Sequence, residues 1–379
     1  MYTLNHIKIN ITDLLNQELG EEVIDQNDLV YPPQIEYGDL SLPCFKLAQK
    51  YQRSPGELAE EMVGYIGNAE GISSVQVYGP YLNIFLERSY LAENILGEIW
   101  KTQEEYGTNG KGEGVKVMVE YSNVNTHKEY HIGHLRNVSY GESVNRILKA
   151  NGYTSIPVSY INDLGIHVAK TLWNYQDFIQ ENYGSEEEVE KLPDEEKGEL
   201  LGRMYVDAAN KEKEDPTAKQ MISGVMKSIE SGEGAEYELW EKTREWNVKQ
   251  FDKIYEELGV KFEKVYYEHQ FTEKGKEKVE EWLEKGILTR SEGAIIADLQ
   301  DYDLGVLVLI RADGTAMYPV GDIALAEQKI QDFDPEHSLY VVDIRQSLYF
   351  QQLFKLLKLA GHEQRFVHLG FDFVKLPEG

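Results

Sequence analysis

An apolar run at residues 115–120 passes into a polar loop and then into a helical pattern from about Leu135 to Lys149. A second strand-like run at 156–161 follows the helical pattern. Two strands joined through a helix form a parallel pair, because their connection must cross over the sheet. The chain is therefore expected to adopt an α/β fold with a Rossmann-like parallel sheet.

The polar loop ends in His131-Ile132-Gly133-His134, where the helical pattern begins. A helix start offers unpaired N–H groups, and together with histidine donors these can hold phosphates. Gly133 has no Cβ and lets a flat base approach the backbone. A short His-x-Gly-His pattern is by itself weak evidence for a phosphate site, since a surface loop with two histidines can have the same sequence.

The chain of 379 residues is long enough for two or three domains. Residues 1–105 alternate helical and strand-like patterns and are expected to form a small α+β domain. A catalytic domain over 106–379 follows, beginning with a glycine-rich linker. Its middle part, at about 175–290, is rich in Glu and Lys and is expected to be a helical insertion.

The parallel sheet is expected to resume after the insertion. Apolar runs at 295–299 and 306–310 are its next expected strands, and runs at 339–342 and 366–370 follow. A helical pattern precedes each of the last two runs, as parallel strands require.

The composition limits the classes of protein that the chain can represent. No stretch approaches the roughly 20 apolar residues of a membrane span, and the start lacks a secretory signal pattern. Cys44 is the single cysteine, which excludes an internal disulfide framework and a cysteine-rich zinc site. These features fit a cytoplasmic protein. The formal net charge of -28 argues against a general nucleic-acid binder.

A longer sequence motif around the two histidines limits the families to which the chain can belong. Glu120-Tyr121-Ser122, Asn125 and Lys128 precede His-Ile-Gly-His-Leu-Arg-Asn at 131–137. This string resembles the signature of class I aminoacyl-tRNA synthetases, specifically the arginyl enzyme. Segments at 37–48 and 79–83 resemble the N-terminal domain of arginyl-tRNA synthetases, which contacts the corner of the tRNA in that family. Composition alone leaves a purely structural domain equally open.

The resemblance implies a reaction in which the arginine carboxylate attacks the α-phosphorus of ATP, followed by transfer to tRNA(Arg). His131 and His134 would donate to the phosphates, and Lys128 would add positive charge, so these three are the expected catalytic residues. Gly133 would lie under the adenine, and Asp343 would face the ribose. Mg²⁺ is expected only with ATP, and no metal-ligating residues are assigned. No membrane and no stable protein partner are implied.

Other residues would bind the amino acid. A guanidinium is best met by carboxylates or a tyrosine hydroxyl. The resemblance assigns this role to Tyr318 and Asp322, while Asn125 and Gln346 match positions that bind the α-amino end. Glu120 is a further candidate anion because it ends the first strand of the sheet. Without the resemblance, Asp322 would be interpreted as an acid that stabilises a helix start.

The segments at 342–346 and 317–321 differ from the family pattern, although Tyr318 and Asp322 keep their places, and the larger departure is an absence. The second signature of the class, Lys-Met-Ser-Lys or a variant, is absent, and it would follow a segment like 376–379, where the chain stops. The helical anticodon-binding domain that comes next in the family is absent as well. We therefore expect a truncated form that binds arginine and ATP weakly and charges tRNA poorly or not at all.

Three alternatives stay open from the sequence. The chain could be a synthetase for another amino acid, although the pair Tyr318 and Asp322 speaks against it. It could be a non-catalytic paralogue or fragment that binds arginine and ATP. A nucleotidylyltransferase shares His-x-Gly-His, but such chains are usually shorter and lack the N-terminal module.

Overall fold

The computed structural model describes residues 2–372, so the segment at 376–379 lies outside the described residues. The chain divides into two compact units, Met1–Thr108 and Asn109–Gly379. Each unit has a hydrophobic core of its own. The sequence predicted a boundary at residues 105 and 106.

The first unit is an α+β structure built on a small antiparallel sheet with the strand order β1-β3-β2. Its strands are β1 (Leu40–Pro43), β2 (Ile72–Tyr78) and β3 (Tyr81–Leu86). Its helices are α1 (Thr3–Leu19), α2 (Phe45–Tyr51), α3 (Pro55–Ile66) and α4 (Arg88–Thr102). Helices α1 and α3 contribute Ile11, Leu15 and Met62 to the core, which they share with Leu82 and Ile84 of β3.

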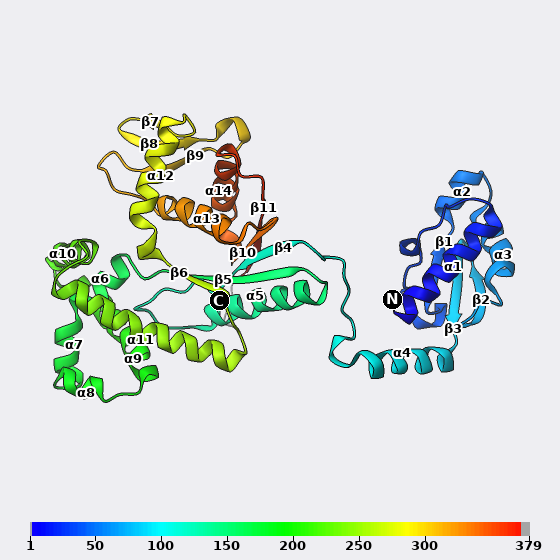
Figure 1. The fold of residues 1–379 in the computed structure, drawn as a ribbon, viewed down its shortest axis with the longest axis horizontal. Coiled ribbons are helices and arrows are strands. Elements are labelled where there is room, and N and C mark those ends of the chain that lie inside the picture. Colours follow the sequence, from blue (N-terminus) through cyan, green and yellow to red (C-terminus); the bar gives the residue numbers. More distant parts are fainter. Residues whose placement is uncertain (1, 373–379) are drawn as a thin grey trace. The chain divides into compact units, whose positions relative to one another are not determined.

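The second unit contains the predicted parallel sheet, which confirms the α/β class (Figure 1). Its strand order is β11-β10-β4-β5-β6, and all neighbouring pairs are parallel. These strands are β4 (Lys116–Glu120), β5 (Thr154–Ile161), β6 (Lys264–Tyr267), β10 (His337–Asp343) and β11 (Arg365–Phe371).

Helices cover both faces of this sheet. Alternate residues of a strand point to opposite faces. Val117 and Val119 of β4 pack with α5 (Ile132–Ala150) and α11 (Ala235–Leu258). Met118, between them, packs on the other face with α13 (Pro319–Phe333). Burial on both faces explains why the strand sequence is continuously apolar rather than alternating.

A block of helices connects β5 to β6. It contains α6 (Ile166–Trp173), α7 (Tyr175–Asn182), α8 (Glu186–Glu190), α9 (Asp194–Glu214), α10 (Ala218–Glu230) and α11. The insertion predicted at about 175–290 is thus helical, but its predicted limits are wrong. The helices begin earlier, at Ile166, and β6 belongs to the parallel sheet. The sequence pattern did not reveal β6 as a strand, because β6 is short and charged residues precede and follow it.

The strands predicted at 295–299 and 306–310 do not resume the parallel sheet. They are β8 (Ala294–Asp298) and β9 (Val306–Ile310), which form a separate antiparallel sheet with β7 (Thr289–Ser291). The physical reason is the connection between β8 and β9, which contains only a short 3-10 turn at Gln300–Tyr302. Such a connection is too short for a crossover and joins antiparallel strands.

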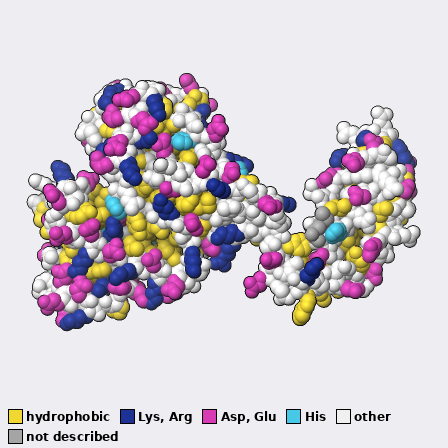
Figure 2. Space-filling model, in the orientation of Figure 1, with side chains coloured by type: hydrophobic (Ala, Val, Ile, Leu, Met, Phe, Trp, Pro, Cys, Tyr) yellow, Lys and Arg dark blue, Asp and Glu magenta, His cyan; other side chains and the backbone are white. Residues whose placement is uncertain are grey.

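The remaining helices of the second unit are α12 (Thr272–Glu284), which follows β6, and α14 (Ser347–Leu359), which lies between β10 and β11. Figure 2 shows acidic and basic side chains mixed over the visible face of each unit. Among residues 2–372, no helix combines the length and the apolar character needed to cross a membrane.

Candidate active site

The carboxyl ends of β4 and β10 lie side by side at the point where the order of the strands in the sheet reverses. β5 pairs with one side of β4, and β10 pairs with the other, so that Tyr340 lies opposite Glu120. Ligands of parallel sheets gather at such a switch point. A cavity of about 420 Å³ opens at this place. Its size falls in the range of small-molecule sites, roughly 300–1,000 Å³.

The cavity brings together nearly all of the residues that the sequence assigned to ligands. Those that line it are Glu120, Asn125, His131, Gly133, His134, Tyr318, Asp322, Asp343 and Gln346. Lys128 does not line it. The Lys128 ammonium instead lies 5.2 Å from the centre of the Tyr205 ring on α9.

The two histidines of the His-x-Gly-His segment cap the start of α5. His131 is the N-cap residue, and its Nδ1 accepts a hydrogen bond from the backbone N–H of Gly133 at 3.1 Å. His134 Nδ1 accepts from the backbone N–H of His131 at 3.2 Å. The two rings stack with their centroids 3.9 Å apart. This capping box fixes both rings at one wall of the cavity.

The capping bonds also determine which ring nitrogens can donate. Because Nδ1 of each histidine accepts a backbone hydrogen bond, a neutral ring carries its proton on Nε2. Burial, together with the nearby charges of His131 and Lys128, lowers the pKa of His134 to about 4. His134 is therefore neutral near pH 7 and offers an Nε2–H donor.

Glu120 is already paired. Its carboxylate forms a buried ion pair with Lys329 of α13, and Asn123 donates to the other carboxylate oxygen at 2.9 Å. Both charged side chains are almost fully buried. Glu120 lines the cavity, but Lys329 balances its negative charge. A buried carboxylate with a matched partner is a weak attractant for a second cation.

Among residues 2–372, Asp322 has no lysine or arginine partner of this kind. Helix α13 starts at Pro319, earlier than the sequence suggested, so Asp322 lies in its first turn and Tyr318 is the N-cap residue. Tyr349 of α14 donates its hydroxyl to Asp322, and the ring of Tyr318 packs edge-on against that of Tyr349 at 4.7 Å. Burial raises the pKa of Asp322 to about 6, and the Tyr349 hydrogen bond opposes this shift.

Glu268 is a second unpaired acid in the cavity, and the sequence did not predict it. It follows β6 directly, at the start of the 3-10 turn Glu268–Gln270. Burial raises the pKa of Glu268 to about 8, with further contributions from the negative charges of Asp163 and Asp322. The available signal was its place at the carboxyl end of a strand, but β6 was not recognised as one.

Glu268 and Asp322 lie at one end of the cavity, and no described cationic side chain balances their negative charge. Within residues 2–372, neither carboxylate forms an ion pair with a lysine or arginine. Tyr160, Tyr318 and Tyr349 line the same end. Two partly buried acids with raised pKa values favour a ligand that brings its own positive charge.

Asp343, at the end of β10, is held by its own neighbour. The guanidinium of Arg345 contacts its two carboxylate oxygens at 2.9 and 3.1 Å, and the backbone N–H of Arg345 donates to Oδ1 at 2.9 Å. These contacts lower the pKa of Asp343. Asp343 lines the cavity, but a ribose hydroxyl would compete with Arg345 for its oxygens.

The α-amino candidates both line the cavity. Asn125 follows β4 and forms a parallel bridge with Asn162, and Gln346 is the N-cap residue of α14. Asn123, which also lines the cavity, has a buried Oδ1 that finds no hydrogen-bond partner among the described residues. An unsatisfied buried acceptor of this kind fits a donor on a ligand.

Two known family models match the chain. Residues 96–376 match the sequence model of "tRNA synthetases class I (R), catalytic domain". Residues 5–86 match the model of "Arginyl tRNA synthetase N terminal domain". The chain is 33% identical over 374 residues to an arginine--tRNA ligase of Clostridium botulinum, and this match covers 98% of the chain. It is 34% identical over 390 residues to an arginine--tRNA ligase of Bdellovibrio bacteriovorus, again over 98% of the chain.

The chain spans about 65% of the length of these curated relatives. Among solved structures, arginyl-tRNA synthetase of Thermus thermophilus aligns with 98% of the chain and 66% of its own, with a TM-score of 0.70 and 23% identity. The Plasmodium falciparum arginyl-tRNA synthetase aligns with 99% of the chain and 66% of its own, with a TM-score of 0.66 and 20% identity.

These two structural similarities establish the fold. The match of the catalytic-domain model over 96–376, which is most of the chain, establishes the family. The chain therefore belongs to the arginyl family of class I aminoacyl-tRNA synthetases.

Proposed function

We propose that the protein acts as an arginine--tRNA ligase, which activates L-arginine with ATP and transfers it to tRNA(Arg). The observation that carries this proposal is the pair of partly buried acids without a lysine or arginine partner among residues 2–372, Glu268 and Asp322, at one end of a cavity with histidine donors at the other. A substrate with a cationic side chain and a free carboxylate fits between these two ends.

At the cation end, the guanidinium of arginine is placed between Glu268 and Asp322, with the Tyr318 hydroxyl as a further acceptor. A guanidinium offers five donors in a planar fork and keeps its charge at all relevant pH values. It would replace the missing counter-charge of both carboxylates. Lysine brings the same charge without the fork and is expected to bind less well.

The amino-acid backbone lies toward the middle of the cavity. Its α-ammonium can donate to the free Oδ1 of Asn123 and to the amide oxygens of Asn125 and Gln346. In this arrangement Glu120 supports the site indirectly. It fixes Asn123 through the 2.9 Å hydrogen bond, which directs Oδ1 away from Glu120.

At the phosphate end, the Nε2–H groups of His131 and His134 donate to ATP phosphates, and Gly133 allows close approach of the adenine. An oxygen of the arginine carboxylate attacks the α-phosphorus, and the bond to the β-phosphate oxygen breaks. This gives arginyl-adenylate and pyrophosphate. A terminal ribose hydroxyl of tRNA(Arg) then attacks the acyl carbon, and AMP leaves. Positioning and charge stabilisation, rather than a protein nucleophile, drive such a reaction.

Mg²⁺ belongs to the proposal only as a companion of ATP. Among residues 2–372, no group of three or more His, Cys, Asp or Glu side chains is arranged to hold a metal ion. Mg²⁺ keeps several waters and is often bound largely by substrate phosphates. The proposed place of the ion is therefore on the phosphates of the bound ATP.

The first unit is proposed to contact tRNA. Its surface carries exposed aromatic and aliphatic side chains, namely Tyr31, Ile35, Tyr37, Phe45, Tyr78 and Tyr81. Exposed rings can stack on unpaired bases with little dependence on charge, which suits a chain with a net charge of -28. A cytoplasmic location, with no stable protein partner, is part of the same proposal.

The test is an arginine-dependent exchange of pyrophosphate into ATP, measured with and without tRNA(Arg). Binding of L-arginine, L-lysine, L-citrulline and L-glutamate is measured in parallel by calorimetry. We expect arginine to bind most tightly, citrulline poorly because it lacks the charge, and glutamate not at all.

The rival functions give different results. Arginine and ATP binding without any exchange, with or without tRNA, would indicate a non-catalytic binding protein. Preference for another amino acid would indicate a synthetase of different specificity. Adenylyl transfer to a small molecule without amino-acid preference would indicate a nucleotidylyltransferase.

A further inference from the structure

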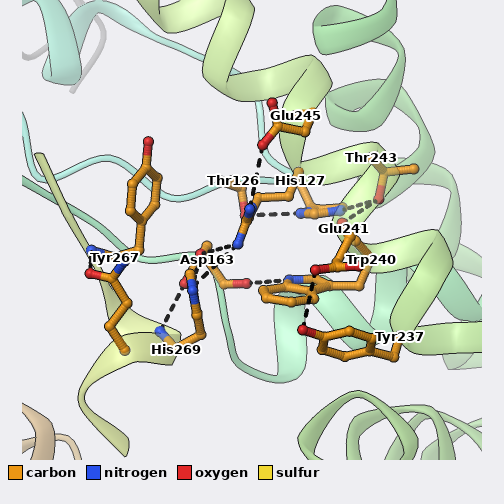
Figure 3. Close-up of polar contacts among 12 residues, drawn as sticks. Thr126, His127, Asp163, Tyr237, Trp240, Glu241, Thr243, Glu245, Tyr267 and His269 are labelled. Carbon is orange, nitrogen blue, oxygen red and sulfur yellow. Dashed lines mark hydrogen bonds and ion pairs between the residues drawn. The ribbon is translucent and has the colours of Figure 1, made fainter. Parts of the chain in front are cut away.

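A polar cluster with a buried centre lies next to Glu268, outside the cavity, and Figure 3 shows its side chains. Its centre is Asp163, which follows the end of β5 and is completely buried. His269 Nδ1 lies 2.5 Å from Asp163 Oδ2, and the backbone N–H of His269 donates to Oδ1 at 3.0 Å. One carboxylate thus takes two donors from the single residue that follows Glu268.

This two-point attachment fixes the backbone from which the Glu268 side chain extends. The N–H that Asp163 accepts belongs to the peptide unit between Glu268 and His269, and a peptide unit is planar. Fixing that plane and the His269 ring fixes the Cα of Glu268. The loop after β5 also holds Glu268 directly, because Asn162 and the backbone N–H of Leu164 hydrogen-bond to its carboxylate.

Helix α11 of the insertion closes the cluster from the other side. The Trp240 indole N–H donates to the backbone oxygen of Asp163 at 2.7 Å, as Figure 3 shows. The Arg244 guanidinium lies 4.8 Å from the Trp240 ring and 3.6 Å from Asp163 Oδ2. Arg244 thereby supplies a counter-charge for the buried carboxylate. A buried charge that is paired and hydrogen-bonded can be held in one place.

We propose that Asp163 and His269 are positioning residues that aim the Glu268 carboxylate at the guanidinium of arginine, with Arg244 completing the unit. This inference rests on the proposed arginine-binding function and deepens it. His269 does not line the cavity, so its effect passes through Glu268.

The test compares His269→Ala with His269→Asn. Asparagine can place an amide N–H near the position of the imidazole Nδ1–H and so keep the bond to Asp163, whereas alanine removes it. The matched control is His362→Ala, because His362 also pairs with an acid, Glu327 at 3.1 Å, and neither of these two residues lines the cavity. Affinities for L-arginine, L-citrulline and ATP are measured by calorimetry, together with the thermal unfolding midpoint.

We expect His269→Ala to weaken arginine binding about 10- to 100-fold, as the loss of a well-aimed charged contact would. Citrulline and ATP affinities should change less than about twofold, so the preference for arginine over citrulline falls. His269→Asn should recover most of that preference, and His362→Ala should keep it fully.

Two outcomes would overturn the proposal while leaving the proposed function intact. In the first, His269→Ala keeps the wild-type preference for arginine over citrulline. In the second, it weakens arginine and ATP binding equally and lowers the unfolding midpoint, as a general structural role would. If the wild-type protein itself does not prefer arginine over citrulline, the proposed function fails, and the positioning role fails with it.

Discussion

The two ends of the cavity are built in opposite ways. At the phosphate end, His131, Gly133 and His134 come from one short segment, and the segment caps its own helix. At the cation end, Glu268 and Asp322 come from separate parts of the chain, after β6 and at the start of α13. The first end is organised by local hydrogen bonds and the second by the tertiary fold.

This difference has an electrostatic counterpart. At the phosphate end His134 is a neutral donor, because burial keeps its pKa far below neutral pH. The cation end holds two acids whose pKa values burial raises to about 6 and about 8. We infer that affinity for the amino acid depends on charge and pH, whereas affinity for ATP depends mainly on hydrogen-bond geometry.

The largest expected effect separates the two ends by charge. Asp322→Asn keeps the shape of the side chain and an acceptor for Tyr349 but removes the negative charge. Arginine binding should weaken roughly 100-fold or more, as for other desolvated charge pairs, while ATP binding stays within about twofold. Calorimetric titration with each ligand measures both. Asp332→Asn, on the same helix but outside the cavity, is the control. An equal loss of both ligands would remove the distinction between the two ends.

A smaller effect is expected at the phosphate end. In His134→Asn, the amide oxygen can still accept the His131 N–H, but no group reaches the position of Nε2. His134→Gln restores a donor there. We expect the asparagine variant to bind ATP about tenfold more weakly, with arginine affinity unchanged, and the glutamine variant to recover most of the loss. If the asparagine variant bound ATP normally, the histidine would serve only as a helix cap.

The pH dependence of ligand affinity should also differ between the two ends of the cavity. Below about pH 8, Glu268 holds a proton in the free protein, and binding a guanidinium favours its loss. Arginine affinity should therefore rise with pH, by up to about tenfold between pH 7 and pH 8.5. Glu268→Gln should flatten this rise, and the ATP affinity should vary little over the same range. A wild-type arginine affinity that is constant or falls with pH would contradict the assignment of Glu268.

The smallest effect is expected for Lys128. Its ammonium lies over Tyr205, and the residue does not line the cavity. Lys128→Met should leave ATP affinity within about twofold of wild type in a direct titration. A tenfold loss would instead support the catalytic role that the sequence assigned to this lysine.

The sequence predicted what is encoded locally. The strand, loop and helix around His131 carry their own pattern, and the parallel sheet followed from the alternation of strands and helices. It could not predict Glu268, because β6 is short and lies among charged residues. Nor could it predict that Lys329 balances Glu120, since that pair joins β4 to α13 across 209 positions of the chain.

The sequence pattern also could not show that β8 and β9 lie outside the parallel sheet. Their apolar runs identify strands correctly, but the pattern does not state which sheet a strand joins. Only the short connection at Gln300–Tyr302 indicates an antiparallel hairpin. Elements whose partners are near in sequence are thus predictable, whereas contacts that depend on the path of the chain are not.

The central claim is that one cavity holds a cationic side chain at one end and a triphosphate at the other. A crystal structure with L-arginine and a non-hydrolysable ATP analogue tests it directly. The account predicts the guanidinium between Glu268 and Asp322, and phosphate oxygens within hydrogen-bond distance of His131 and His134 Nε2. A guanidinium bound at any other place, with Glu268 and Asp322 left unpaired, would contradict it.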